Sequence, residues 1–368
     1  MRIGIGAILG ILGGPATYAR ELIRALAHVD AANEYVIMTD VPEALGVSAP
    51  NVRCVRAPLR SSLYQPVWDH VVVPYFVRRC AVDLYHGTKG TLPIWSGCRA
   101  VVTVHDLAVY HQPETFAWLQ RVHQRSHTPF AVRRAARVIA DSEYGRHDLL
   151  QRFGCAPDHV VAIPLAANAG FDDRPSVDDA RIAAALELPH RYLLYAGTIQ
   201  PRKNVEMLVA AFDGLANRGD VQLILAGRVR PGFQPDFLRA PPAQVRYLGP
   251  VSERELAVLY RRAMLFCSPS SYEGFGLSVL EAMRSGCLVI TGRNSAVTEV
   301  VHDCGLLLDE LSVAALRRAL GRVVADSAHF DGMRQAARQR ASEYNWDDTA
   351  RRTLAVYREA VETVRAAA

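Results

Sequence analysis

Short apolar runs rich in Val and Ile alternate with segments of helical periodicity along most of the chain, and this alternation is the strongest constraint on its fold. It is typical of parallel sheets with helices on both faces. The segment 165–176 has no periodicity and carries Asn, Gly, Asp and Pro, which indicates a break between domains. Before the break, the pattern predicts a helix over 16–28 and strands over 2–8, 35–39, 100–104, 137–140 and 160–164.

The alternation begins again after the break and ends in a helical tail over 312–368 that is too long for one final strand-helix unit. The predicted helices are 204–216, 253–262 and 277–284, and the predicted strands are 191–196, 221–226, 245–248, 264–268 and 288–291. We therefore expect an α/β protein of two doubly wound, Rossmann-like domains that face a central cleft, with residues 1–172 in the first and 173–345 in the second.

Composition narrows the class of protein. The 368 residues carry 42 Lys and Arg against 37 Asp and Glu, a formal charge of +5, and no basic block indicates nucleic-acid binding. Seven scattered cysteines without a Cys-x-x-Cys pair favour reduced thiols and a cytoplasmic protein. No apolar run reaches 18 residues, so we expect no membrane span.

The most informative stretch is 268–283, where a predicted strand, a glycine-containing loop and a helix that begins at about Gly276 follow one another. Unpaired N–H groups at such a helix start form an anion site. Glu273 and Glu281 flank it, and carboxylates beside an anion site are better suited to the hydroxyl groups of a ribose or a sugar ring. A surface loop with one solvated and one helical glutamate fits the same spacing.

A second strand end, at 196–204, places Arg202 and Lys203 at the start of a helix, an arrangement that suits a diphosphate. Only Lys89 and Lys203 among the 42 basic residues are lysine, so each is an unusual choice in an arginine-rich chain. Lys89 could border the cleft. The alternative for the pair at 202–203 is two solvated cations at a loop tip.

Three weaker patterns serve mainly to argue against other classes of protein. The turn at 10–15, with Gly4 and Gly6, has the wrong spacing for a dinucleotide fingerprint, which disfavours a nicotinamide-dependent dehydrogenase. His123 and His127 lie one helical turn apart without an evident third ligand, so we expect no metal site. No Asp-x-Asp pair is present to hold a metal bound to a diphosphate. His105 follows a strand, where an imidazole could donate to a substrate oxygen or fill a structural role.

Taken together, the motifs resemble the retaining glycosyltransferases of family 4, in the order of that family and over about residues 10–310. The motifs are Gly13-Gly14, His105-Asp106, Asp141-Ser142-Glu143-Tyr144, the segment 197–204 and the segment 273–281. The resemblance implies the GT-B fold, with an acceptor domain, a nucleotide-sugar domain, and a terminal helix, about 346–368, that returns to the first domain. Two departures from the family pattern are Gly286-Cys287-Leu288, without the usual proline, and Pro164-Leu165-Ala166 in place of Pro-x-Gly.

The resemblance also implies a role for individual residues. Arg202 and Lys203 would hold the donor diphosphate, Glu281 the ribose, and Glu273 the transferred sugar. His105 would reach the sugar hydroxyls and Gly14 would leave room for the phosphate. Backbone groups complete the expected donor set, at Val251 for the base and at Phe275, Gly276 and Leu277 for the transferred sugar, and Ser278 is expected to bind the donor as well.

The implied activity is metal-independent, retaining, front-face transfer of a hexose of mannose or glucose type from a GDP- or UDP-linked donor to a saccharide or a lipid-linked saccharide. No further cofactor is expected. A nucleotide-sugar epimerase or hydrolase of the same fold is the alternative, and a dehydrogenase or a non-catalytic binding protein is less favoured. A helix-like pattern over 116–138 could rest on anionic lipid at the inner face of a membrane, or be a plain solvated surface. Its large residues are Trp118, Arg121, Arg125, Phe130, Arg133, Arg134 and Arg137.

Overall fold

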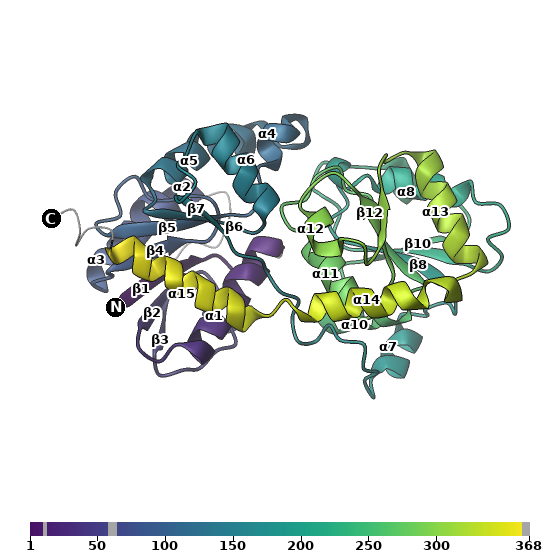
Figure 1. Cartoon of the computed structure of the whole chain (residues 1–368), viewed down its shortest axis with the longest axis horizontal. Coiled ribbons are helices and arrows are strands. Elements are labelled where there is room, and N and C mark those ends of the chain that lie inside the picture. Colours follow the sequence, from purple (N-terminus) through teal and green to yellow (C-terminus); the bar gives the residue numbers. More distant parts are fainter. Residues whose placement is uncertain (10–12, 58–64, 363–368) are drawn as a thin grey trace. The chain divides into compact units, whose positions relative to one another are not determined.

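The computed structural model describes residues 1–9, 13–57 and 65–362 and divides into two compact units (Figure 1). The first comprises Met1–Leu165 with Asn345–Ala368, and the second comprises Ala166–Tyr344. The division falls after Leu165 rather than after residue 172, because the aperiodic segment packs into the second unit. Phe171 is buried there, edge-on against Tyr260, with 5.8 Å between the ring centroids.

The first unit is built on a seven-stranded parallel sheet in the order β3-β2-β1-β4-β5-β6-β7. Its strands are β1 (Arg2–Ala7), β2 (Glu34–Thr39), β3 (Val52–Arg56), β4 (Leu84–Gly87), β5 (Arg99–Val104), β6 (Arg137–Ala140) and β7 (Val160–Ala162). Its helices include α1 (Gly14–Val29), α2 (Gln65–Val67), a π-helical stretch Trp68–Val72, α3 (Val73–Arg79), α4 (Ala108–His111), α5 (Trp118–Arg134) and α6 (Glu143–Phe153). The helix-like pattern over 116–138 is thus helical only at 118–134, and its end belongs to the strand that follows α5, β6.

The last helix, α15 (Trp346–Glu362), completes this first unit, as the resemblance implies. It packs against α1 and buries Tyr357, whose hydroxyl lies 2.7 Å from Nδ1 of His86 on β4. Arg99 on β5 donates to the carbonyl oxygen of Ala360 at 3.1 Å. The predicted helical tail is therefore three separate helices, and only the last belongs to this unit.

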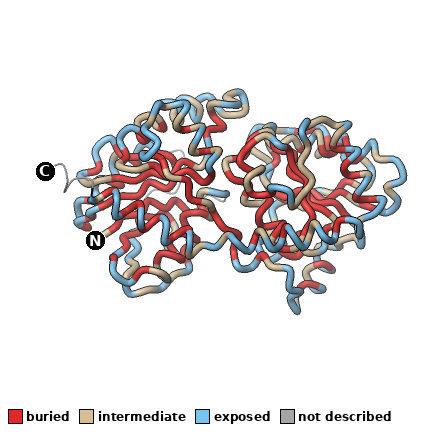
Figure 2. The backbone as a smooth tube through the Cα atoms, viewed as in Figure 1, coloured by how far each residue is buried: buried red, intermediate tan, exposed pale blue. Residues whose placement is uncertain are grey.

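The second unit holds a six-stranded parallel sheet in the order β10-β9-β8-β11-β12-β13. Its strands are β8 (Tyr192–Ala196), β9 (Gln222–Ala226), β10 (Val245–Gly249), β11 (Leu265–Ser268), β12 (Val289–Gly292) and β13 (Leu306–Leu308). Its helices are α7 (Asp179–Ala185), α8 (Val205–Asp213), α9 (Asp236–Arg239), α10 (Glu253–Arg262), α11 (Leu277–Arg284), α12 (Val297–Val301), α13 (Val313–Ala325) and α14 (Asp331–Ser342). The central strands of each sheet are buried on both faces, as Figure 2 shows for each unit.

Local chemistry sets where the helices begin. Ser252 and Glu255 form a capping box at the start of α10, and Ser142 accepts a hydrogen bond from the backbone N–H of Gly145 at 3.0 Å to cap α6. The helix predicted from residue 204 starts at Val205, because Asn204 adopts a left-handed conformation with φ of 49° after a 3₁₀ turn at Pro201–Lys203.

Candidate active site

The sheet of the second unit reverses its direction of growth between β8 and β11, which are hydrogen-bonded neighbours at its centre. The loops that leave the carboxyl ends of two such strands diverge, and ligands of open α/β sheets bind there. The loop after β8 carries Arg202 and Lys203, and the loop after β11 carries Glu273. The strand order thus brings together two motifs that are about 70 residues apart in the sequence.

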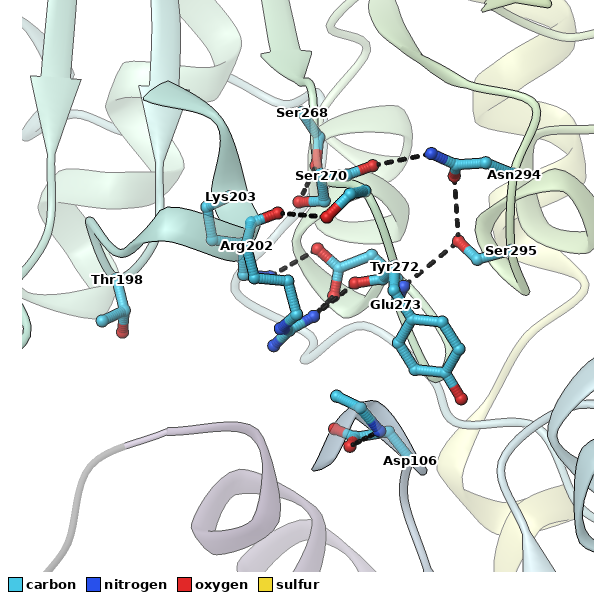
Figure 3. A network of polar contacts seen from close by, with 12 residues as sticks. Asp106, Thr198, Arg202, Lys203, Ser268, Ser270, Tyr272, Glu273, Asn294 and Ser295 are labelled. Atoms are coloured by element: carbon cyan, nitrogen blue, oxygen red, sulfur yellow. Dashed lines mark hydrogen bonds and ion pairs between the residues drawn. The ribbon is translucent and has the colours of Figure 1, made fainter. Parts of the chain in front are cut away.

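Glu273 is ion-paired with both cations (Figure 3). Its Oε1 accepts a hydrogen bond from Nζ of Lys203, and its Oε2 lies 3.5 Å from Nη1 of Arg202, which also donates to the carbonyl oxygen of Tyr272. Burial alone would raise the pKa of Glu273, but the charges of Lys203 and Arg202 outweigh it and lower the pKa to about 2. The carboxylate is therefore ionised at neutral pH and partly neutralises the cationic pair.

Further hydrogen bonds fix the two loops against each other, and the sequence analysis gave no role to three of the residues that make them, Asn204, Asn294 and Ser295. The carbonyl oxygen of Arg202 accepts from the backbone N–H of Ser271 at 3.0 Å, and Asn204 donates to the carbonyl oxygen of Pro269 at 3.0 Å. From the loop after β12, Ser295 accepts from the backbone N–H of Glu273 at 3.1 Å and Asn294 donates to the carbonyl oxygen of Ser270 at 3.0 Å. Asn204 could have been suspected from its place directly after Lys203, whereas Asn294 and Ser295 carry no motif.

Helix α11 begins at Leu277, as predicted, and Gly276 is the cap residue before it. Gly276 has a φ of 101°, and a Cβ atom there would lie 3.0 Å from Cγ2 of Val297, so the turn requires glycine. Within the described residues no side chain caps this helix, so the N–H groups at Leu277 and Ser278 start it without a side-chain acceptor. Phe275 is buried before the turn, edge-on to Tyr344.

Glu281 lies about one turn into α11 and is 8% exposed. Burial and the nearby charge of Glu253 raise the pKa of Glu281 to about 8, and no side-chain hydrogen bond to it forms among the described residues. A buried carboxylate without donors gains most from a ligand that supplies them. Hydroxyl groups are such donors.

A third cation, Arg230, lies beside the loop after β8, and the sequence analysis did not single it out. Its backbone N–H donates to the carbonyl oxygen of Ile199 at 3.0 Å, and burial together with the charge of Arg202 lowers its pKa. Val251 lies after β10, between Gly249 and the cap residue Ser252. Arg230 follows β9 and Val251 follows β10, and these two strands lie on the same side of β8 in the sheet.

In the first unit, His105 follows β5 and uses both ring nitrogens within the protein. Nδ1 lies 2.8 Å from Oδ2 of Asp141, and Nε2 lies 2.9 Å from the carbonyl oxygen of Thr88. Because both partners are acceptors, both nitrogens donate, which requires the charged imidazolium. Burial lowers the pKa of His105, but Asp141, the carbonyl of Thr88 and the charge of Asp106 together outweigh burial, so the net shift is upward. The hydrogen bond that we expected His105 to offer a substrate is made to Thr88 here.

The other expected positions of the first unit, Gly14 and Lys89, lie in the segments that follow β1 and β4, the two neighbouring strands at the centre of its sheet. Gly14 is the first residue of α1, and a Cβ atom there would meet no described residue within 4 Å. The rest of the predicted glycine turn, residues 10–12, lies outside the described residues. Lys89 follows β4, and burial lowers its pKa against the attraction of Asp40 and Asp69.

Among the described residues no group of three or more His, Cys, Asp and Glu side chains is arranged to hold a metal ion. His123 and His127 lie with ring centroids 4.3 Å apart, and each of the seven cysteines is a free thiol. In the same part of the chain, no helix combines the length and apolar character of a membrane span.

Two parallel α/β units, a strand order that reverses at the centre of each sheet, and a last helix that returns to the first unit define a GT-B protein with its cationic cluster at a strand switch point. Family comparisons agree with this class. The family described as Glycosyltransferase Family 4 matches residues 12–169, and Glycosyl transferases group 1 matches residues 178–342. The O-antigen chain mannosyltransferase B of Escherichia coli is 30% identical over 284 residues, which cover 75% of this chain and 74% of that protein. The chain belongs to the family 4 glycosyltransferases.

Solved structures of low sequence identity share the fold. The sucrose-phosphate synthase of Thermosynechococcus elongatus superposes with a TM-score of 0.77 at 24% identity, over 100% of both chains. HepE of Anabaena, solved in complex with UDP-glucose, superposes with a TM-score of 0.75 at 17% identity, also over 100% of both chains. These likenesses show the GT-B fold, with a sheet of seven strands and one of six in this chain.

Proposed function

We propose that the chain transfers a hexosyl group, with retention of anomeric configuration, from a nucleoside diphosphate sugar to a saccharide or lipid-linked saccharide acceptor. The observation that carries the proposal is the cluster of Arg202, Lys203 and Glu273 at the switch point between β8 and β11. Such a cluster, beside an uncapped helix start at Gly276, suits a diphosphate that gains charge when it leaves.

The proposed reaction breaks the bond between the anomeric carbon and the diphosphate oxygen, and the electron pair stays on the diphosphate. The cations at 202 and 203 stabilise that charge, so this step does not call on a metal ion. The acceptor hydroxyl then bonds to the anomeric carbon from the same face, and its proton passes to an oxygen of the leaving diphosphate. Retention at the anomeric carbon follows from attack on the face that the leaving group vacates.

The ion pairs of Glu273 add a step to the sugar-binding role that the family resemblance gives it. Glu273 forms ion pairs with both Arg202 and Lys203, so a diphosphate that binds these cations has to share or replace the ion pairs. We propose that the carboxylate then turns to hydroxyls of the transferred sugar, where an ionised group is a strong acceptor. Glu281 is proposed to accept from the ribose hydroxyls, which would supply the donors that it lacks.

The donor is proposed to carry a hexose of mannose or glucose type on GDP or UDP. The similarity to a mannosyltransferase and to a protein solved with UDP-glucose supports this substrate class. The roles that the family resemblance gives to Gly14, Val251 and His105 remain predictions.

The test is a panel of GDP-, UDP- and dTDP-linked sugars, measured first by the rise in melting temperature on binding. Stabilising donors are then incubated with saccharide acceptors, and the anomeric configuration of the product is assigned by NMR. Transfer with inverted configuration would contradict the proposed mechanism. Release of free sugar or of an epimer without an acceptor would support a hydrolase or epimerase instead.

A further inference from the structure

The large apolar side chains that are exposed in the described part of the first unit gather on three segments, apart from Met1. The helical segment 65–79 contributes one stripe at a spacing of four residues, the loop after β4 contributes two side chains, and the start of α5 contributes three. These residues are Val67, Val71, Tyr75, Ile94, Trp95, Trp118, Leu119 and Val122, and we call them the apolar face. They are between 40% and 71% exposed. The described part of the second unit exposes only Val177 and Tyr247 in this way.

Contacts between neighbouring residues make the apolar face continuous. The rings of His70 and His127 lie 5.2 Å apart and join the helical segment to α5. The backbone N–H of Ile94 lies 3.3 Å from Nδ1 of His70, which joins the loop to the same segment. The guanidinium of Arg78 lies 4.0 Å above the ring of Trp95. These contacts hold all three segments on one side of the unit.

The apolar face is bordered by arginines and lacks exposed carboxylates of its own. The helical segment 65–79 and α5 carry six arginines and one acidic residue, Asp69, which is buried. The arginines are Arg78, Arg79, Arg121, Arg125, Arg133 and Arg134. In the described ranges, none of the six is ion-paired with a carboxylate, whereas exposed arginines of the second unit such as Arg181 and Arg239 pair with Asp178 and Asp236. A hollow of about 520 Å³ between Trp95, Arg99 and Arg134 adds a cationic recess.

We propose that the apolar face docks on the surface of a bilayer that contains anionic phospholipid. Exposed Trp, Tyr, Val and Leu insert at the level of the headgroups, and the arginines around them attract the negative surface. The positive charge of the apolar face favours an anionic bilayer over a second copy of this chain, because two copies of this face would bring arginines against arginines. This inference goes beyond the proposed transfer reaction, since it concerns the surface of the first unit and not the donor cluster of the second.

The direct test is co-sedimentation of the full chain with vesicles of phosphatidylcholine alone or with about 30% phosphatidylglycerol, at low and high salt. We expect binding to the anionic vesicles only, weaker at high salt because the attraction is screened. The variant Arg125→Gln with Arg133→Gln should bind at least about tenfold more weakly, since each arginine near such a surface contributes a severalfold factor. The variant Trp118→Ser with Leu119→Ser should lose the part of the binding that resists salt.

Matched controls lie in the second unit. Arg181→Gln with Arg239→Gln removes two exposed arginines, and Val177→Ser removes a fully exposed apolar side chain. All of these side chains are exposed, so each variant should keep the melting temperature of the wild type. Each should also keep its affinity for nucleoside diphosphate, which separates a failure here from a failure of the proposed reaction.

Absence of binding to anionic vesicles at low salt would overturn the proposal, as would equal losses in the control variants. A concentration-dependent dimer, detected by sedimentation velocity and dispersed by the Trp118 and Leu119 substitutions, would show instead that a second copy covers the face. Binding to both kinds of vesicle with no effect of salt would reject the role of the arginines.

Discussion

Lys203 and Glu273, from loops that follow two adjacent strands, form an ion pair in which both side chains are less than one-fifth exposed. The pair has a direct consequence for donor binding, because the lysine that we propose for the diphosphate is already engaged by a carboxylate. Ligand and carboxylate therefore compete for the same charge.

Substitution of Lys203 tests the charge itself. We expect Lys203→Met to lower kcat/KM by about 10²–10³, as for loss of one group that stabilises a developing negative charge. Lys203→Arg keeps the charge but not the compact ammonium, and should recover part of the rate. Steady-state kinetics with the best donor measure both effects, and Arg239→Ala serves as the control for loss of a cation from the same unit. A wild-type rate in a folded Lys203→Met protein would remove this residue from the site.

Substitution of Glu273 should separate binding from turnover. Glu273→Gln removes the competing charge, so we expect the affinity for free nucleoside diphosphate to rise about tenfold, in line with the energy of one charge at this range. Turnover should fall, because the sugar loses its acceptor. Calorimetry and kinetics on the same preparation measure the two quantities, and a fall in both would argue against competition for the cations.

Glu273→Gln should also change how the free energy of unfolding depends on pH. The pKa of Glu273 is lowered to about 2 in the folded protein, so its ionised form stabilises the fold above about pH 4.5, and this contribution is lost as the pH falls toward 2. The free energy of unfolding of the wild type should therefore exceed that of Glu273→Gln by a constant amount near neutrality. Urea denaturation between about pH 3 and 7 should show the difference shrinking at the acid end, and a constant difference would contradict the ion pair.

Glu281 predicts proton release on donor binding. Its pKa is raised to about 8 in the free protein, and ribose hydroxyls that donate to the carboxylate favour the ionised form. At about pH 7.5 we expect calorimetry in buffers of different ionisation enthalpy to show that nucleoside diphosphate binding releases a fraction of a proton. The variant Glu281→Gln should bind more weakly and show no such release, so it also corrects for titration of the phosphate. Equal proton release in both proteins would exclude Glu281 as its source.

The contribution of Glu281 to stability should depend on pH in the opposite direction to that of Glu273. A carboxyl group whose folded pKa is raised stabilises the fold at low pH, and this stability is lost as the pH rises from about 4.5 to about 8. Without ligand, Glu281→Gln should therefore gain melting temperature relative to the wild type above about pH 7. Thermal unfolding at about pH 5 and about pH 8.5 measures the change in that difference.

The substitution Gly276→Ala tests the backbone conformation at the start of α11. An alanine there would combine a φ of 101° with a Cβ atom 3.0 Å from Val297, and we expect a loss of about 1–3 kcal/mol in unfolding free energy. Gly332 lies within α14, and a Cβ atom added to it would meet nothing within 4 Å, so Gly332→Ala should be tolerated or should gain stability. Urea denaturation of the pair of variants measures the contrast.

The sequence predicted the elements that carry strong periodicity and clear boundaries. The helices predicted over 253–262 and 277–284 match α10 and α11 to the residue, and in the structure a capping box begins the first and a glycine precedes the second. Strands β3, β4 and β13 were missed, since none is an uninterrupted apolar run: β3 exposes polar side chains, β13 is three residues long, and β4 is buried but includes His86 and Gly87. Local pattern cannot reveal strands whose stability comes from their neighbours.

The two main motifs of the site were also found from the sequence, but not the pairing between them. Lys203 meets Glu273 only because β8 lies next to β11, and strand order is a property of the whole sheet. The sequence showed Glu273 as a carboxylate beside an anion site, and the structure shows it as the counter-ion of that site. Similarly, no local sequence pattern indicated that the carbonyl oxygen of Thr88 would form a hydrogen bond with Nε2 of His105.

The return of α15 to the first unit has a consequence for synthesis on the ribosome. Helix α1 precedes the second unit in the sequence and packs against α15, which is translated after that whole unit and buries Tyr357. The continuous segment Ala166–Tyr344 is fully translated before that helix emerges. The first unit is thus begun before the second and completed after it, and nascent chains stalled at residue 344 would hold a complete second unit and an incomplete first.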